Sequence, residues 1–176
     1  EIDNEQAITD YLYLLELCTD VLGKDSLLYG IIINNLAVLY NSVDEFEKAL
    51  PLYKESIEFI EKKNGIYNSD YINCINGLVD IYTSMEEYTK AIEFSKESLK
   101  ITQINLGKKH LDYSICLNKL ANLYKINDQY SNALSLYQEG VEIAKYDENI
   151  HYIEYAIRLS NLASFYKEIA EYSKAL

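Results

Sequence analysis

The residue types that most often carry chemistry are few in this sequence and are poorly placed to cooperate. Its two histidines are His110 and His151, and neither has a convincing metal-ligand partner at helical spacing, since His151 with Glu154 is a weak pair. Adjacent acids such as Glu86 and Glu87 are more simply a solvated helix start. There is no glycine-rich phosphate loop and no nucleophile motif. We therefore predict no catalytic residue, no metal site and no cofactor, in a protein that is not an enzyme.

Cysteine content and charge narrow the classes of partner. Three cysteines with no close pair, Cys18, Cys74 and Cys116, do not form a secreted disulfide framework, which favours a cytoplasmic protein. The net charge of −12 argues against nucleic acid or an anionic membrane as the main partner, because both attract basic surfaces. No apolar run approaches the ~20 residues of a membrane span. We therefore predict neither nucleic acid nor a membrane as the partner.

Two sets of polar residues are candidates for binding a partner molecule. Asn34, Asn76 and Asn118 recur at one spacing, although asparagine is a poor residue within a helix. Their amides could bind a peptide backbone, or they could hydrogen-bond the neighbouring helix. A basic set, in a chain that is otherwise acidic, could attract an acidic peptide or could simply be a solvated face. This basic set is Lys119, Lys125, Arg158 and Lys167.

These residues must be positioned by a repeat, which is the strongest signal in the chain. The segment 36–40, Leu-Ala-Val-Leu-Tyr, recurs every 42 residues as Leu-Val-Asp-Ile-Tyr at 78–82, Leu-Ala-Asn-Leu-Tyr at 120–124 and Leu-Ala-Ser-Phe-Tyr at 162–166. Such periodicity indicates stacked supersecondary units, none of which buries its apolar face alone. A second block keeps the same register: Phe46…Ala49-Leu50, Tyr88…Ala91-Ile92, Tyr130…Ala133-Leu134 and Tyr172…Ala175-Leu176.

Each unit is predicted to contain two helices. Tyr29, Ile33, Leu36 and Tyr40 have the spacing of one helical face, so the tyrosine columns belong to the core rather than to a binding surface. A second helix follows after a short turn. The predicted helices lie near 4–22, 26–42, 45–63, 68–84, 87–105, 110–126, 129–146 and 150–168.

The helix ends also have recognisable signals. Two pairs resemble capping boxes at the start of second helices, Asp44 with Glu47 and Ser84 with Glu87. Second helices are predicted to end at a residue with positive φ, because glycine and asparagine tolerate that conformation. This column contains Gly23, Gly65, Gly107 and Asn149.

The order Leu-Ala-x-x-Tyr, then an aromatic residue, then Ala-x-x-x-Tyr, resembles the tetratricopeptide repeat. The longer unit is similar to the 42-residue repeats of kinesin light chains. That resemblance implies an all-α, right-handed superhelical solenoid of antiparallel helix pairs. The stretches that carry it are Asn34-Asn35-Leu36-Ala37-Val38-Leu39-Tyr40, Ala49-Leu50-Pro51-Leu52-Tyr53-Lys54-Glu55-Ser56-Ile57 and Leu106-Gly107-Lys108-Lys109-His110.

On this basis residues 1–176 form one fragment of a tetratricopeptide domain. It comprises a half repeat (1–25), repeats 26–67, 68–109 and 110–151, and a partial repeat (152–176). The resemblance further implies that the first helices line a concave groove that holds a peptide. The groove positions include Ile31, Val38 and Asn41 with their counterparts, and the candidate ligand-binding residues are Asn34, Asn76, Asn118, Lys119, Asn122, Lys125, Arg158, Ser160 and Lys167.

Two functions remain open. The first is an interaction scaffold that binds a peptide or protein segment, including an acidic one, in the groove. The second is a peptide-sensing regulatory domain that controls an effector domain outside this fragment.

Overall fold

The computed structural model describes residues 4–66, 69–146 and 152–175. Within these ranges the chain forms eight α-helices and no strand, so the prediction of an all-α fold is confirmed. The helices are α1 (Asn4–Leu22), α2 (Leu27–Ser42), α3 (Phe46–Asn64), α4 (Ser69–Ser84), α5 (Tyr88–Leu106), α6 (Leu111–Ile126), α7 (Tyr130–Tyr146) and α8 (Tyr152–Ala175).

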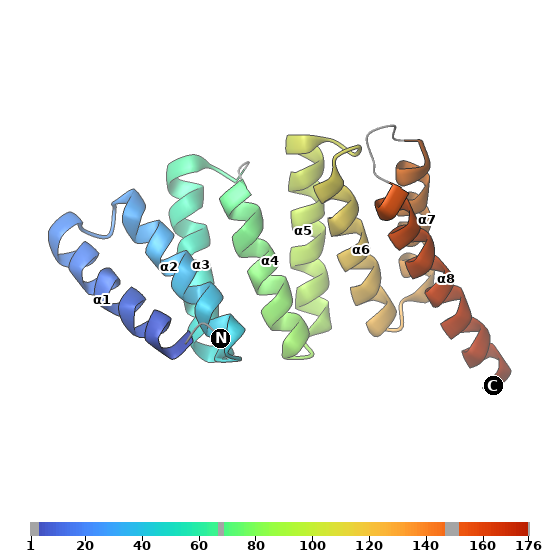
Figure 1. Ribbon diagram of the computed structural model, residues 1–176, viewed down its shortest axis with the longest axis horizontal. Coiled ribbons are helices and arrows are strands. Elements are labelled where there is room, and N and C mark those ends of the chain that lie inside the picture. Colours follow the sequence, from blue (N-terminus) through green and yellow to red (C-terminus); the bar gives the residue numbers. More distant parts are fainter. Residues whose placement is uncertain (1–3, 67–68, 147–151, 176) are drawn as a thin grey trace. The chain divides into compact units, whose positions relative to one another are not determined.

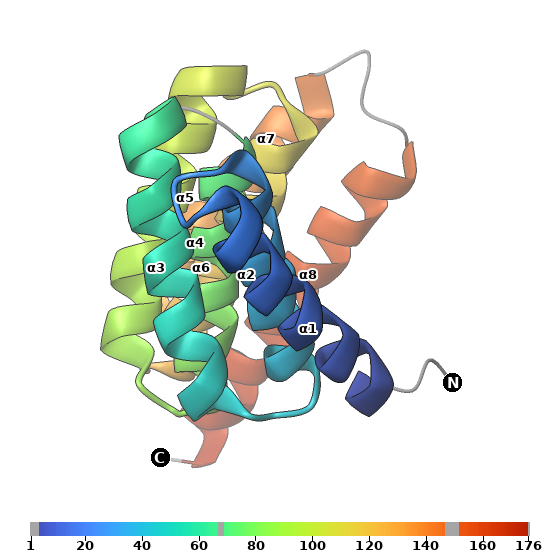
Figure 2. The same ribbon diagram turned by 90° about the vertical axis from the view of Figure 1, so that its left-hand side faces the viewer.

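The helices are grouped in two compact units, Glu1–Glu87 with α1–α4 and Tyr88–Leu176 with α5–α8. In unit 1, α2 packs against α1, α3 and α4, and α3 packs against α4 (Figures 1 and 2). In unit 2, α6 packs against α5 and α7, and α7 packs against α8 (Figure 1). Within each unit, short connections make sequential helices antiparallel. The first helices of the repeats are α2, α4, α6 and α8, since these contain the segment that recurs every 42 residues.

The glycine column ends second helices as predicted. Gly23, Gly65 and Gly107 have φ values of 77°, 74° and 81°, in the left-handed region that costs glycine nothing. The Gly65 amide donates to the Glu61 carbonyl at 3.2 Å and so satisfies one group at the end of α3. Asn149 lies outside the described residues.

The turns between first and second helices differ from the predicted capping boxes. Asp44, Glu86 and Asp128 have φ values of 59°, 60° and 56° and follow the first helices as left-handed residues. The amide of the residue after each of them donates a hydrogen bond to the carbonyl of the tyrosine five residues before that amide. For example, Glu45 N donates to Tyr40 O at 2.9 Å. The capping-box interpretation was therefore wrong. The N-cap of α3 is Glu45, and its side chain makes no capping hydrogen bond.

The last helix also differs from the prediction, because α8 continues to Ala175 instead of ending near 168. Ala170 occupies the position at which the earlier repeats have Asp44, Glu86 and Asp128. Alanine is the best helix former, and a left-handed alanine costs roughly 1–2 kcal/mol. Continuing the helix through Ala170 therefore costs less free energy than making the turn there.

Tyrosine columns form the core, as the periodicity indicated. The tyrosines in the first helices of the first three repeats are at most 8% exposed, namely Tyr29, Tyr40, Tyr71, Tyr82, Tyr113 and Tyr124. In α8, Tyr155 is half-buried and Tyr166 is 48% exposed. The exposure of Tyr166 follows from the continued α8, since no second helix folds back over this position within the described part of the chain.

Glycines inside the first helices make room for aromatic rings from second helices. A Cβ atom at Gly77 in α4 would overlap the Tyr53 ring of α3, and one at Gly30 in α2 would overlap the Phe59 ring. Gly140 in α7 has no such neighbour, because a Cβ there would meet Arg158 Cδ at an ordinary 3.9 Å. The two kinds of glycine therefore respond differently to a methyl group.

We expect Gly77→Ala to destabilise the fold by about 1–3 kcal/mol, since the added methyl group must displace the buried Tyr53 ring. Gly140→Ala is the matched control and should stabilise it by up to about 1 kcal/mol, because alanine is the better helix former. Urea unfolding monitored by circular dichroism measures both. Equal effects of the two substitutions would contradict the close contact between Gly77 and Tyr53.

Candidate functional site

Exposed apolar side chains recur at the same positions of three first helices. We call this surface the first-helix face and define it by positions 27, 31, 34 and 38 and their counterparts at the repeat spacing. The helix α4 has polar residues, Ser69 and Asn73, at the first two positions. The apolar side chains are between 40% and 71% exposed, and they are Leu27, Ile31 and Val38 in unit 1, and Leu111, Ile115, Ile153 and Ile157 in unit 2.

The asparagine column lies at the border between this face and the core. Asn34 Oδ1 accepts a hydrogen bond from Cys74 Sγ at 3.1 Å, and Asn118 Oδ1 accepts one from Asn161 Nδ2 at 2.9 Å. Both bonds reach the first helix of the following repeat, so the amide carbonyls hydrogen-bond the neighbouring helix. Asn76 is half-buried at the same position of α4. The sequence left open whether these amides bind a peptide backbone or hydrogen-bond the neighbouring helix. The structure shows the hydrogen bond to the neighbouring helix for Asn34 and Asn118.

The Cys74 thiol is held in its donating, protonated form. Burial raises the pKa of this thiol, the hydrogen bond with Ser56 at 3.4 Å partly offsets that rise, and the charge of Asp70 raises the pKa further. A protonated thiol can donate to Asn34. This contact therefore fixes the amide of Asn34 and connects α2 to α4.

Asn122 and Lys125 on α6 are each held by a neighbouring helix of unit 2. The exposed Asn122 accepts a hydrogen bond from the Tyr137 hydroxyl of α7. Lys125 Nζ lies 3.0 Å from Glu168 Oε2 of α8 and donates to it. Both side chains are thus positioned before any partner binds. Lys119 is half-buried, whereas Ser160 and Lys167 are exposed.

Arg158 differs from the other predicted binding residues, because it is buried with 5% exposure rather than solvated. Its Nε donates to Ser114 Oγ of α6. The equivalent positions of the two preceding repeats hold Cys74 and Cys116, whose thiols face Ser56 and Ser98. Gly140 occupies the corresponding position opposite Arg158 and leaves room for its larger side chain. Arg158 therefore belongs to the packing between α7 and α8.

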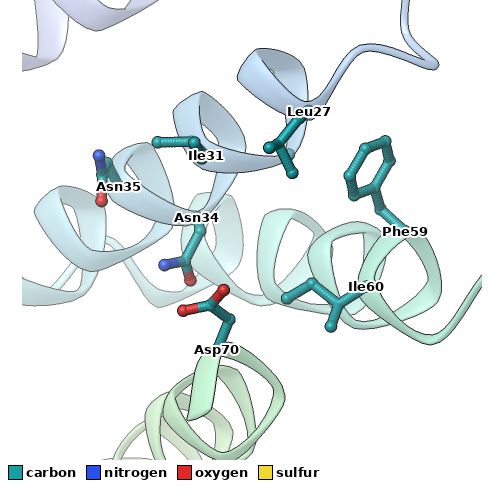
Figure 3. A pocket seen from close by; sticks show the side chains of 8 residues that line it. Leu27, Ile31, Asn34, Asn35, Phe59, Ile60 and Asp70 are labelled. Carbon is teal, nitrogen blue, oxygen red and sulfur yellow. The ribbon is translucent and has the colours of Figure 1, made fainter. Parts of the chain in front are cut away.

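A pocket opens on the first-helix face of unit 1. It has a volume of about 250 Å³ and lies between α2, α3 and the first turn of α4 (Figure 3). The sequence pointed to two of its residues, Ile31 and Asn34 on α2, and not to Phe59, Ile60 and Asp70, which α3 and α4 bring to the pocket. A signal was present in Leu27 and Ile31, which are apolar at helical spacing but off the core face. The lining residues are Leu27, Gly30, Ile31, Asn34, Asn35, Phe59, Ile60 and Asp70.

Among the residues that the structure places, no group of three or more histidine, cysteine or acidic residues could hold a metal ion. None of the helices, so far as they are described, is both long and apolar enough to cross a bilayer. All three cysteines are buried free thiols.

Comparison with protein families gives a clear match. Residues 3–62 and 71–145 match the family described as tetratricopeptide repeat. No curated protein sequence matches the chain.

Solved structures of similar fold cover nearly the whole chain. The crystal structure of BtubC (BKLC) from P. vanneervenii has a TM-score of 0.82 at 20% identity, over 99% of this chain and 70% of its own. The putative kinesin light chain nearly identical TPR-like repeats from Podosopora anserina give 0.83 at 18% identity, over 98% and 82%. A single-substitution variant of those repeats gives 0.84 at 16% identity, over 98% and 81%. At these identities the likeness confirms the fold, a solenoid of tetratricopeptide type.

Two buried tyrosines give the fold a predicted weakness at high pH. Burial chiefly raises the pKa of Tyr53 and of Tyr137 to about 12, with further contributions from Cys74 and Asp80 for Tyr53 and from Glu168 for Tyr137. A pKa above the unfolded value of about 10 means that folding favours the neutral phenol. The stabilisation is complete below pH 10 and is lost as the pH rises from about 10 to about 12.

We therefore expect the free energy of unfolding to fall over this range by about 2–3 kcal/mol per tyrosine. Urea unfolding at several pH values measures it. The double variant Tyr53→Phe, Tyr137→Phe lacks both phenols and should lose less stability over the same range. An identical pH dependence in the variant would assign the loss to other groups.

Proposed function

The chain belongs to the tetratricopeptide repeat family, and we propose that it holds a segment of another protein or peptide against its first-helix face. Repeats of this family are generally non-enzymatic interaction scaffolds. The proposal adds where the partner lies and which side chains contact it.

The observation that carries this proposal is the recurrence of exposed apolar side chains on the first helices. In unit 2, Ile115 of α6 and Ile157 of α8 occupy the same repeat position and are 44% and 43% exposed. Leu111 and Ile153 lie one helical turn before them and are also exposed. Contacts from Asn161 to Asn118 and from Lys125 to Glu168 hold α6 and α8 beside each other. Clustered apolar side chains in water favour covering by a partner.

Polar groups beside the apolar side chains would orient that partner. The carbonyl oxygen of Asn118 is already used by Asn161, and its amide nitrogen can donate to a peptide carbonyl. Asn122 is exposed and is fixed by Tyr137, so its ordering costs little on binding. Asn76 and Ser160 occupy the same repeat position as Asn118, on α4 and α8, and belong to the same set by sequence.

Charge favours an acidic segment at unit 2. Lys125 and the exposed Lys167 lie on its first helices, and charge-assisted hydrogen bonds are stronger than neutral ones. Glu168 competes for Lys125, so an acidic ligand would exchange an internal ion pair for an external one at that position. This exchange reduces the gain from Lys125. The alternative role, a peptide-sensing regulator of an effector domain, remains a prediction of the sequence.

A direct test uses peptides selected on the purified chain from a random display library. The double variant Ile115→Asn, Ile157→Asn should weaken their binding about tenfold, since two apolar contacts are lost. The fold should survive, because α4 already has Asn73 at this position. Ile104→Asn is the matched control, since Ile104 is 56% exposed but lies on the second helix α5. Fluorescence anisotropy gives the affinities. Equal weakening by the control, or none in the double variant, would exclude the first-helix face as the binding surface.

Charge reversal tests the basic side chains separately. Lys125→Glu with Lys167→Glu should weaken the binding of acidic selected peptides about tenfold and reduce its salt dependence, because attraction becomes repulsion. Lys54→Glu with Lys145→Glu makes the same change in net charge on exposed second-helix positions of α3 and α7. Titrations at low and at physiological salt compare the two variants. If both weaken binding equally, the effect is one of net charge and the assignment to Lys125 and Lys167 is wrong.

A further inference from the structure

We propose that the pocket in unit 1 is a lysine-recognition pocket, in which the alkyl stem of a partner's lysine lies on the apolar walls and Asp70 accepts its ammonium group. This inference rests on the proposed function, because it assumes a polypeptide on the first-helix face. It assigns to unit 1 a ligand chemistry opposite in charge to that favoured at unit 2.

The walls of the pocket suit an aliphatic stem. Leu27 and Ile31 of α2 face Phe59 and Ile60 of α3 across the opening (Figure 3). Leu27 and Ile31 are 62% and 50% exposed, so covering them removes apolar surface from water. Gly30 at the pocket has no Cβ, and the Phe59 ring lies against it. A volume of about 250 Å³ is large enough for one long side chain.

The rim of the pocket offers oxygen acceptors. The Asp70 carboxylate is directed toward the Asn34 amide (Figure 3). The Asn34 carbonyl oxygen accepts from Cys74 and keeps a second lone pair. Asn35 donates through Nδ2 to the Tyr11 hydroxyl at 3.2 Å, so its Oδ1 is the atom left for a ligand. An ammonium group has three donors and no acceptor, which matches this arrangement.

The charge of the pocket points to a cation. Asp70 is its one ionisable lining residue, and none of the residues that form it is lysine, arginine or histidine. Lys63 is not among the lining residues, although its Nζ lies 6.0 Å from the Phe59 ring centre. It lies 3.9 Å from Asp25 Oδ1, which also pairs with Lys62 at 3.4 Å. A net charge of −12 adds a general attraction for cationic segments.

Other side chains fit this pocket less well. A partner carboxylate would be repelled by Asp70, and an apolar side chain such as leucine would desolvate that carboxylate without pairing it. Lysine combines a flexible alkyl stem with a compact charge at its tip. The corresponding surface of unit 2 has Lys119 in place of Asn35, which would oppose a second cation there. Lysine recognition is thus specific to unit 1.

The experiment uses three small probes that share one alkyl chain, namely n-pentylammonium, 1-pentanol and pentanoate. Each is titrated into the full chain with isotope-labelled methyl groups, and shifts at Leu27, Ile31 and Ile60 are followed by NMR. We expect pentylammonium to bind at least about threefold more tightly than pentanol, as for an exposed ion pair, and pentanoate more weakly than either. Added salt should reduce the advantage of pentylammonium.

The variant Asp70→Asn should remove that advantage and leave pentanol binding unchanged. Asp112→Asn is the matched control, since Asp112 is the counterpart of Asp70 one repeat later and also lies in the first turn of its helix. It should preserve the preference for pentylammonium. Equal binding of pentylammonium and pentanol to the unchanged protein, a preference that survives Asp70→Asn, or shifts confined to other methyl groups would each overturn the proposal. These outcomes are independent of the Ile115 and Ile157 variants in unit 2, so failure of the pocket and failure of the first-helix face are distinguishable.

Discussion

Packing of each second helix onto the first helix of the next repeat is the interaction on which the remaining features depend. A single helical hairpin exposes one apolar side, and that side is covered by the following repeat. At one position of this contact, a small residue of the second helix faces a residue of the next first helix whose type varies between repeats. The pairs are Ser56 with Cys74, Ser98 with Cys116, and Gly140 with Arg158. A serine thus faces a cysteine at two of these junctions, and a glycine faces the arginine at the third.

This constraint also decides which side chains remain for a partner. Side chains of a first helix that face the preceding second helix are buried between the two. Side chains at the adjacent positions around the same helix reach solvent. Arg158 illustrates the rule, because its charge suggested a surface role while its position placed it opposite Gly140. The asparagines lie at the boundary and link successive first helices through their carbonyl oxygens. Ile31, Ile115 and Ile157 lie beyond the boundary, so they are exposed although they are apolar.

The sequence predicted most of the fold because an unbroken period fixes helix phase and length together. It also predicted the positive φ of Gly23, Gly65 and Gly107, because glycine adopts this backbone conformation without steric cost. It failed where the backbone conformation was unusual for the residue, as at Glu86 with positive φ, and where one alanine at 170 replaced the turn residue. The pocket was not predictable as a whole. Its walls meet only after α2, α3 and α4 pack, and local spacing carries no information about residues from three helices.

The three buried cysteines can report on the opening of the contacts between repeats. Cys18 hydrogen-bonds Ser26 between α1 and α2, Cys74 contacts Ser56 between α3 and α4, and Cys116 contacts Ser98 between α5 and α6. Each thiol is thus enclosed at a different junction between repeats, and alkylation requires that junction to open. The rate at which a thiol reagent modifies each cysteine, resolved by mass spectrometry, therefore gives the opening free energy junction by junction. A native protein without added labels can show in this way whether its repeats separate one at a time or all together.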